Sequence, residues 1–406
     1  MLSVSDALHI VMSEVSPLPQ EQLDLQDSLG KVLAEDIHAP LSLPRFDSSS
    51  MDGFAVRAAD LQSASTASPV ELPVAGEATA GQPARSLPPG PCCIRIMTGA
   101  VLPCGANAVV MQENTVLEPA GTIRFTAPAV PGEFVRVSGE DIRQGDPVIP
   151  AGTVIRPAEI AVLAALGLAQ IRVIRSPRMA LITTGNEVVL PGNPLLPGQI
   201  YDANRYMLQA LATDAGFQVR TILHVQDEPG ATEAILARAA EGSDVVICSG
   251  GVSVGAHDHV RGAVERLGCI RFWRVAMKPG KPLVFGRVRQ ALFFGLPGNP
   301  ASSMVSFELF VRPALRALAG CQQIYRPRVQ SRLLTPIPHT PGREEYARAS
   351  TRKMGDQFVS RAADAQESHR FRPMITANSL LQIPSERGSV EAGEILPAIM
   401  TGWPEI

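Results

Sequence analysis

The residues most suggestive of chemistry lie in the stretch 244–268, which reads DVVICSGGVSVGAHDHVRGAVERLG. Its apolar, β-branched beginning is typical of a buried strand. Ser249, Gly250 and Gly251 predict a turn directly after that strand, because glycine adopts backbone angles that other residues rarely can. Asp258 is a good N-cap for the helix that the later apolar spacing predicts. Loops that join parallel strands to helix N-termini bind anions, so this turn is a candidate anion site.

Acidic side chains follow this strand and two others. Glu187 follows a strand in TTGNEV, and Asp227 and Glu228 follow a strand in VQDEPG. Because the carboxyl ends of parallel strands meet at one edge of a sheet, we expect these carboxylates and Asp258 to converge there. Hard oxygen ligands suit Mg²⁺, which completes its shell with phosphate and water. Asp227 and Asp258 fit equally well as plain N-caps, and the choice between Asp227 and Glu228 stays open.

Two lysines stand out because this chain otherwise uses arginine. Of its 36 basic residues only four are lysines, yet Lys278 and Lys281 both occur in MKPGKP, with Arg274 just upstream. A solvated surface run would not need lysine, whereas a compact point charge suits a small oxyanion. We therefore interpret both lysines as anion ligands.

A second anion-binding turn is predicted in GLPGNPASS, residues 295–303. Gly298 and Pro300 favour a sharp passage from strand to helix, whose first amides would face a phosphate-like ion. A plain helix start with proline in its first turn explains the prolines equally well. Only its expected place at the same edge of the sheet favours the anion site.

These candidate residues need a sheet that brings them together, and the middle of the chain predicts one. Between residues 171 and 320, strands alternate with helices, which indicates a doubly wound α/β/α fold. Strands are expected at 178–184, 217–225, 244–248 and within 272–296, and helices at 202–215, 230–241, 260–267 and 300–319.

The flanking regions have other patterns. Helices are expected at 2–15, near 27–34, and from Pro157 to Gly167, whereas short β-like runs fill 69–139. Further β-like runs follow a Pro-rich boundary at 326–342. The chain is thus expected to be an α/β multidomain protein. Residues 1–43 together with 140–172 are expected to form a helical and linking unit, into which 44–139 is inserted as a β-rich domain. Residues 173–325 form the expected α/β/α domain, and 326–406 a small β-barrel-like domain.

Composition excludes several classes of protein. The 406 residues are 45% hydrophobic and 18% charged, as in soluble globular proteins, and a net charge of −3 argues against a nucleic-acid binder. No apolar run reaches the roughly 20 residues of a membrane helix, and the N-terminus predicts a helix rather than a signal peptide. The six cysteines lack a C-x-x-C pair, so we expect reduced thiols and a cytoplasmic protein.

Six motifs resemble the molybdopterin molybdenumtransferases, the MoeA type shared by the E domain of gephyrin. The matching segments are SSSMDGFAV (48–56), RIMTGA (95–100), TTGNEV (183–188), SGGVSVGAHD (249–258), MKPGKP (277–282) and GLPGNPASS (295–303). The resemblance covers essentially the whole chain. It implies transfer of molybdenum from molybdate into adenylylated molybdopterin with release of AMP, a magnesium ion, and an elongated homodimer of four-part subunits.

The resemblance also implies roles for individual residues. It implies that loops of the β-rich domain reach the α/β site of the other subunit, which makes Asp52 and Thr98 candidates. Arg274 stands where the family usually has lysine, and QESHRFRPM (366–374) departs from the family pattern, so no residue is assigned there. The implied catalytic residues are Asp52, Thr98, Glu187, Asp258, Lys278 and Lys281. The implied substrate-binding residues are Asp227, Glu228, Ser249, Gly250, Gly251, Ser253, Arg274, Pro297, Gly298, Asn299, Pro300 and Arg348. The implied magnesium ligands are Glu187, Asp227 and Asp258.

The sequence shows no nucleophile–base pair, so we expect the chemistry to rest on positioning and electrostatics. Magnesium would neutralise the pyrophosphate, and the lysines would hold molybdate against the dithiolene sulfurs of the substrate. Two other functions stay open: an adenylyltransferase acting one step earlier, and a scaffold of the gephyrin type. The flanking β-rich domains favour the later enzymatic step. Contacts with other cofactor-biosynthesis proteins would be transient, and no nucleic acid or membrane partner is expected.

Overall fold

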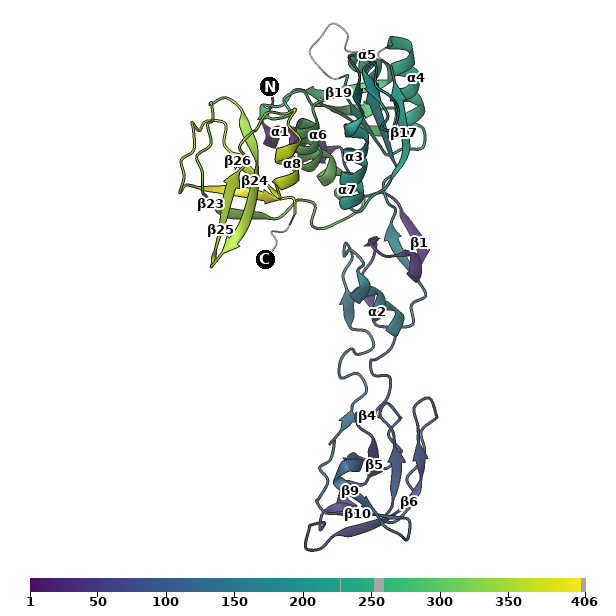
Figure 1. Ribbon diagram of the computed structural model, residues 1–406. Coiled ribbons are helices and arrows are strands. Elements are labelled where there is room, and N and C mark those ends of the chain that lie inside the picture. The colour runs from purple at the N-terminus through teal and green to yellow at the C-terminus, as the bar shows by residue number, and fades with distance from the viewer. Residues whose placement is uncertain (227, 252–258, 403–406) are drawn as a thin grey trace.

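The computed structural model describes residues 1–226, 228–251 and 259–402. The molecule is elongated, with an α/β unit and a C-terminal barrel side by side at one end and a β-rich unit at the other (Figure 1). A narrow stalk that contains β1 and α2 joins the two ends. No helix in the described ranges is long and apolar enough to cross a membrane.

A mixed six-stranded sheet forms the centre of the α/β unit, residues 173–325. The first four strands in its spatial order run parallel, and the last two run antiparallel to their neighbours. The predicted strands at 178–184, 217–225 and 244–248 are confirmed. The spatial order is β17 (Val219–Val225), β14 (Met179–Thr184), β18 (Val245–Ser249), β22 (Ala291–Leu296), β21 (Val284–Val288) and β19 (Gly268–Trp273).

Helices cover both faces of this sheet, which confirms the doubly wound fold. Because successive strand residues point to opposite faces, Leu181 and Phe294 pack with one helix group, whereas Ile182 and Phe293 pack with the other. One group contains α3 (Ala203–Asp214), α6 (Pro300–Ser306), a π-helical turn (Phe307–Val311), α7 (Arg312–Leu318) and α1 (Val4–Ser13). The other group contains α4 (Pro229–Ala240) and α5 (His259–Leu267).

The C-terminal barrel is a second six-stranded sheet that closes on itself through an extra β24–β26 pairing. Its strand β23 lies inside the stretch predicted as a Pro-rich boundary, 326–342, so that prediction missed a strand. Its edge strand β20 comes from the α/β unit. The order is β20 (Met277–Lys278), β24 (Glu344–Met354), β25 (Gln357–Ala362), β23 (Arg328–Leu333), β27 (Ile395–Met400) and β26 (Ser379–Ile383), and a short helix α8 (Arg372–Thr376) follows β25.

The β-rich unit forms a third sheet, as its short apolar runs predicted. Phe54 and Phe125 meet edge to face in its core, with ring centroids 6.2 Å apart. The order is β8 (Ala108–Met111), β5 (Gly53–Val56), β7 (Cys93–Ile96), β6 (Val70–Ala78), β10 (Thr122–Phe125) and β9 (Thr115–Leu117), and β4 (Ser48–Ser49) pairs separately with β11 (Val135–Arg136).

The stalk corrects one predicted helix. A 3₁₀ turn (Leu25–Asp27) and the short strand β2 (Val32–Leu33) occupy the stretch predicted as helical near 27–34. Val32 and Leu33 are buried where β2 pairs with β13, so tertiary pairing decides their conformation. The helix expected from Pro157 is confirmed. The stalk elements are β1 (Gln20–Asp24), β2, β3 (Ile37–His38), β12 (Pro147–Ile149), α2 (Pro157–Ala165) and β13 (Gln170–Ile174).

The predicted division into four units stays a prediction. Helix α1 was grouped with the helical and linking unit, yet its buried Val4, Ala7 and Val11 pack into the core of the α/β unit. The six cysteines all lie among the described residues, and none of them forms a disulfide bond. Burial raises the pKa of the Cys93 thiol to about 12, so this cysteine behaves as a small apolar residue.

Candidate functional site

A cavity of about 790 Å³ lies at the carboxyl edge of the α/β sheet. The ends of β14, β18 and β22 open into it, because Thr183, Ser249 and Leu296 are neighbours in the parallel ladder. The N-terminal turn of α3 and the loop before α6 complete this side. The cavity therefore lies where parallel α/β sheets usually bind their ligands.

The glycine turn after β18 depends on two backbone positions that other residues would distort. Gly250 and Gly251 have φ angles of +91° and +66°. A Cβ on Gly250 would lie 2.7 Å from the Oγ1 of Thr184, and one on Gly251 would lie 2.6 Å from the Cγ2 of Val260. The turn predicted from Ser249, Gly250 and Gly251 is confirmed, and its backbone lies against the cavity.

Two polar residues at the start of α3 were missed by sequence reasoning. Asn204 donates to the Oγ of Ser249 at 2.9 Å and to the carbonyl of Gly298 at 2.6 Å, so it ties together the two predicted anion turns. Asp202 is 4% exposed, and its Oδ1 accepts from the amide of Arg205 at 2.9 Å. The signal in the sequence was weak, because an aspartate at this place already serves as the N-cap of the helix.

Asp202 and Asn204 each keep one unsatisfied oxygen beside the cavity. The Oδ2 of Asp202 and the Oδ1 of Asn204 are buried, and neither accepts a hydrogen bond from any described residue. Buried acceptors without a donor are costly, by about 1–3 kcal/mol each. A ligand with N–H or O–H groups, or a bound cation, would satisfy both atoms.

The C-terminal barrel supplies the wall opposite the sheet. His369 and Phe371, from the loop between β25 and α8, line the cavity, and Tyr201 provides a second half-exposed aromatic ring on the α/β side. The loop is fixed to the α/β unit, because Asn299 donates to the Oγ of Ser368 at 2.9 Å. Sequence reasoning assigned no residue in this loop.

The same loop covers part of the second predicted anion turn. The amide of Ala301 donates to the carbonyl of Ser368 at 3.3 Å, so this amide is not free for a phosphate or molybdate. Pro297, Gly298, Asn299 and Pro300 nevertheless line the cavity. The turn therefore contributes surface to the cavity, with fewer free amides than a bare helix start would offer.

Arg348 lies behind this loop rather than on the cavity wall. Its side chain is fully buried, and its guanidinium donates to the carbonyls of Ala365, Glu367 and Arg370 at 3.2–3.4 Å. Burial lowers the pKa of this arginine. Its contacts are those of a residue that shapes the loop.

The magnesium ligands are the least defined part of the site. Glu187 lines the cavity, and its carboxylate lies close over Gly185. Asp227, Ser253 and Asp258 lie outside the described residues. Within the described ranges, no three acidic, histidine or cysteine side chains converge on one point. Glu187 and the open Oδ2 of Asp202 are hard oxygen donors, and they fit a cation that takes few protein ligands.

The predicted cationic residues do not line the cavity. Arg274 is exposed near Trp273, and Lys281 is exposed one residue before Pro282, which does line the cavity. Lys278 is paired with Glu345 of the C-terminal barrel, at 3.1 Å between Nζ and Oε2. Glu228 also lies off the cavity, at the N-cap of α4.

Asp52 and Thr98 form a small site of their own in the β-rich unit. The Oδ1 of Asp52 accepts from the amide and the hydroxyl of Thr98, each at 2.7 Å. These two hydrogen bonds, the backbone one first, lower the pKa of the Asp52 carboxyl. The unit that carries β5 and β7 lies at the far end of the molecule from the cavity (Figure 1), so one chain does not bring the two sites together.

The predicted site residues thus fall into three groups. Those that line the cavity are Glu187, Ser249, Gly250, Gly251, Pro297, Gly298, Asn299 and Pro300. Those that lie elsewhere are Asp52, Thr98, Glu228, Arg274, Lys278, Lys281 and Arg348. Asp227, Ser253 and Asp258 belong to neither group, because the structure does not describe them.

Comparison with known families matches three regions of the chain in order. Residues 2–167 match the MoeA N-terminal region (domain I and II). Residues 180–317 match a probable molybdopterin binding domain, and residues 330–400 match the MoeA C-terminal region (domain IV).

Individual relatives cover almost the whole chain. A molybdopterin molybdenumtransferase of Haemophilus influenzae is 37% identical over 97% of both chains. Molybdopterin molybdenumtransferase 2 of Mycobacterium tuberculosis is 39% identical over 97% of this chain and 98% of its own. The crystal structure of a molybdopterin biosynthesis MoeA protein from Pyrococcus horikoshii has a TM-score of 0.84 at 32% identity and covers 99% of both chains.

Proposed function

Because this chain belongs to the MoeA family of molybdopterin molybdenumtransferases, enzymes of molybdenum cofactor biosynthesis, we propose that its cavity holds adenylylated molybdopterin during molybdenum insertion. Family membership confirms the resemblance that six sequence motifs indicated. In the proposed reaction, the dithiolene sulfurs of the pterin replace oxygen ligands of molybdate, and the displaced oxygen leaves as water. Water also adds across the phosphoanhydride bond to the adenylate, so that AMP leaves and the pterin keeps its phosphate.

The pair of unsatisfied oxygens at the start of α3 is the observation that best supports this use of the cavity. The Oδ2 of Asp202 and the Oδ1 of Asn204 can accept from the N–H and O–H groups of a pterin nucleotide. Tyr201 and Phe371 offer half-exposed rings on which a flat heterocycle can stack. A volume of about 790 Å³ suits a ligand of this size.

The proposed chemistry relies on holding charged groups in place. The backbone of the glycine turn and the loop at 297–300 would orient the phosphates. Lys278 and Lys281 lie outside the cavity lining but within four residues of the cavity-lining Pro282, and they would hold molybdate beside the cavity. Glu187, with the predicted Asp227 and Asp258, would hold Mg²⁺, which when bound neutralises charge on the pyrophosphate. The thiolates that bind molybdenum belong to the substrate, which agrees with the largely buried cysteines of this chain.

The position of Asp52 supports a homodimeric site. The hydrogen-bonded Asp52–Thr98 pair is exposed and belongs to the β-rich unit. This unit lies at the opposite end of the molecule from the α/β unit that carries the cavity (Figure 1). We therefore propose that the β-rich unit of one subunit completes the cavity of the other. Six cysteines without a disulfide bond further support a cytoplasmic location, where transient contacts would hand the pterin from one enzyme to the next.

A reconstitution assay tests the proposal. Purified protein is mixed with adenylylated molybdopterin and Mg²⁺, and AMP is measured before and after molybdate is added. We expect release of AMP that depends on molybdate, together with transfer of active cofactor to an apo-molybdoenzyme. Glu187→Gln should lower the rate by about a hundredfold, because an amide gives a cation no charge.

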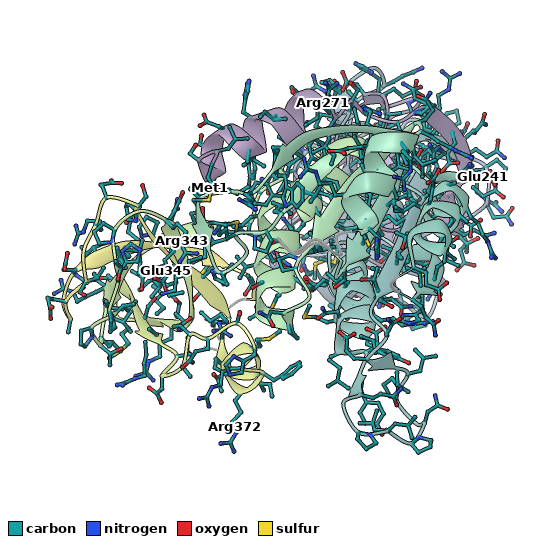
Figure 2. All side chains as sticks on the ribbon, turned by 90° about the horizontal axis from the view of Figure 1, so that it is seen from above. Met1, Glu241, Arg271, Arg343, Glu345 and Arg372 are labelled. Carbon is teal, nitrogen blue, oxygen red and sulfur yellow. The ribbon has the colours of Figure 1, made fainter. Side chains whose placement is uncertain are left out.

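The matched control is Glu241→Gln, which removes an exposed carboxylate at the C-terminal end of α4, where Glu241 pairs with Arg289. Glu241 lies on the side of the α/β unit that faces away from the C-terminal barrel (Figure 2). This variant should release AMP at the wild-type rate. Formation of adenylylated molybdopterin from ATP and molybdopterin, without any response to molybdate, would identify an adenylyltransferase instead. Binding of the nucleotide without either reaction would favour a scaffold.

A further inference from the structure

Lys278 lies where the α/β unit meets the C-terminal barrel. Its strand β20 has only two residues, Met277–Lys278, and it pairs in parallel with β24 of the barrel. In this register Lys278 is the direct neighbour of Glu345, and its Nζ lies 3.1 Å from the Oε2 of that residue. The barrel therefore determines where this lysine places its charge.

Glu345 needs a cation, because its side chain is only 2% exposed. A buried carboxylate is strongly destabilising unless it is paired. Besides Lys278, the Nε2 of the buried His339 lies 3.7 Å from the same oxygen. The two ring nitrogens of His339 lie 3.0 and 3.1 Å from the carbonyl oxygens of Arg387 and Arg343. Because its Nζ is closer to the carboxylate than the His339 ring is, Lys278 is the nearest cationic partner of Glu345 among the described residues.

Lys278 does not depend on Glu345 in the same way. Its side chain is 43% exposed, so the ammonium could reach water without a protein partner. Lys281 shows that behaviour, because it is exposed and forms no ion pair with a described residue. The carboxylate, rather than burial of the lysine, accounts for the fixed place of the Lys278 ammonium.

We propose that Glu345 is a positioning residue, which holds the Lys278 ammonium for the oxyanion of the proposed reaction. This role rests on the proposed function of Lys278 as an anion ligand. Lys278 lies outside the cavity lining, four residues before Pro282, which does line the cavity. An ammonium has three N–H donors, so the contact with Glu345 leaves two for a tetrahedral oxyanion. A guanidinium directs its donors in a planar fork, so it would present them to Glu345 and the oxyanion in a different geometry.

The first test needs no substrate and uses the scarcity of lysine in this chain. Native protein is treated briefly with a trace acylating reagent, and the modification of each of the four lysines is measured by mass spectrometry. We expect Lys278 to react more slowly than Lys281 in the wild type, because the ion pair shields it. In Glu345→Gln this difference should disappear, whereas Lys353 should react as before.

The matched control is Glu344→Gln. Glu344 is the preceding residue of β24, and it accepts from Tyr346 and Gln382 rather than from Lys278. This variant should leave the reactivity of Lys278 unchanged. Thermal unfolding of both variants checks that the barrel stays folded. Equal reactivity of Lys278 in the wild type and in folded Glu345→Gln would overturn the proposal.

The second test links Glu345 to molybdate through a double-mutant cycle. Glu345→Gln should raise the molybdate concentration for half-maximal AMP release by about tenfold, since contacting residues couple at this magnitude. In a Lys278→Met background the same change should cost nothing more, because no ammonium is left to position. In a Lys281→Met background, the increases in the required molybdate concentration caused by Lys281→Met and by Glu345→Gln should multiply.

If Glu345→Gln still raised the molybdate requirement tenfold in the Lys278→Met background, Glu345 would not act by positioning Lys278. A lower molybdate requirement in Glu345→Gln would contradict that role as well. A wild-type protein that releases no AMP would instead refute the proposed function. The acylation test would still decide whether Glu345 holds Lys278, so the two failures are distinguishable.

Discussion

Asp52 shows how one hydrogen-bonded neighbour stabilises the ionised form of a carboxylate. The amide of Thr98, and then its hydroxyl, donate to the Oδ1 of Asp52 and lower the pKa of that carboxyl. The pKa of Asp52 is lower in the folded state than in the unfolded state. These hydrogen bonds therefore contribute their full stabilisation of the folded state at pH values above the unfolded-state pKa. That contribution is lost as the pH falls through the folded pKa. At neutral pH, Asp52 is therefore an anion that Thr98 holds in place.

Replacing Thr98 tests this account. Thr98→Val removes the hydroxyl donor but keeps the amide donor, so the pKa of Asp52 should rise and still stay below its usual value. The titration is followed by NMR through the carboxyl carbon of Asp52. Thr115→Val, which removes a hydroxyl from another turn of the same unit, should leave Asp52 unchanged. An unaltered Asp52 titration in Thr98→Val would mean that the hydroxyl bond does not form in solution.

The turn after β18 is the element on which the cavity most depends. Gly250 has a φ of +91°, and a Cβ there would lie 2.7 Å from the Oγ1 of Thr184 and 3.1 Å from its carbonyl oxygen. An alanine would therefore suffer both an unfavourable backbone angle and a clash with β14. The clash would push the turn away from the strand end and into the cavity.

Two alanine variants separate these effects. Gly242→Ala, with a φ of +71° and open space around its Cβ, should cost only the backbone strain of about 1–2 kcal/mol. Gly250→Ala should destabilise the protein by roughly 1–3 kcal/mol more, because a clash is added. Urea unfolding measures both values. Equal losses of stability would show that the turn can move aside without cost.

The elongated shape of the molecule is the basis for the proposal that a second chain completes each cavity. The β-rich unit is held away from the α/β unit by the stalk (Figure 1), so under this proposal Asp52 would serve the cavity of another chain. In a symmetric dimer, each cavity would then combine Glu187 of one subunit with Asp52 of its partner. Single-site variants at these two positions should complement each other.

Mixing the two variants tests this arrangement. We expect the Asp52→Ala protein and the Glu187→Gln protein to be inactive when each is assayed alone. After subunit exchange, an equal mixture of the two should regain about a quarter of the wild-type rate. This fraction arises because half of the dimers are mixed and each mixed dimer has one intact cavity. Exchange is verified by mass spectrometry. No recovery after complete exchange would place both residues in the site of a single chain.

The local sequence determined most of the α/β unit. The strands at 178–184 and 244–248 and the helices from Asp202 and Pro300 follow from apolar periodicity, capping residues and proline, which act within a few positions. The glycine turn was predictable for the same reason, since its backbone angles are a property of Gly250 and Gly251 themselves. Parallel strands then had to bring Glu187 and Ser249 to one edge.

Only the tertiary structure decided which residues close the cavity and which carboxylate pairs with Lys278. His369 and Phe371 reach the cavity because Arg348 and Asn299 fix their loop, and Lys278 meets Glu345 across 67 positions of sequence. The strand β2 replaced a predicted helix because Val32 and Leu33 found a partner in β13. Such contacts carry no periodic signal, since each depends on how separate units pack, and packing overrides the weak local preferences of the residues involved.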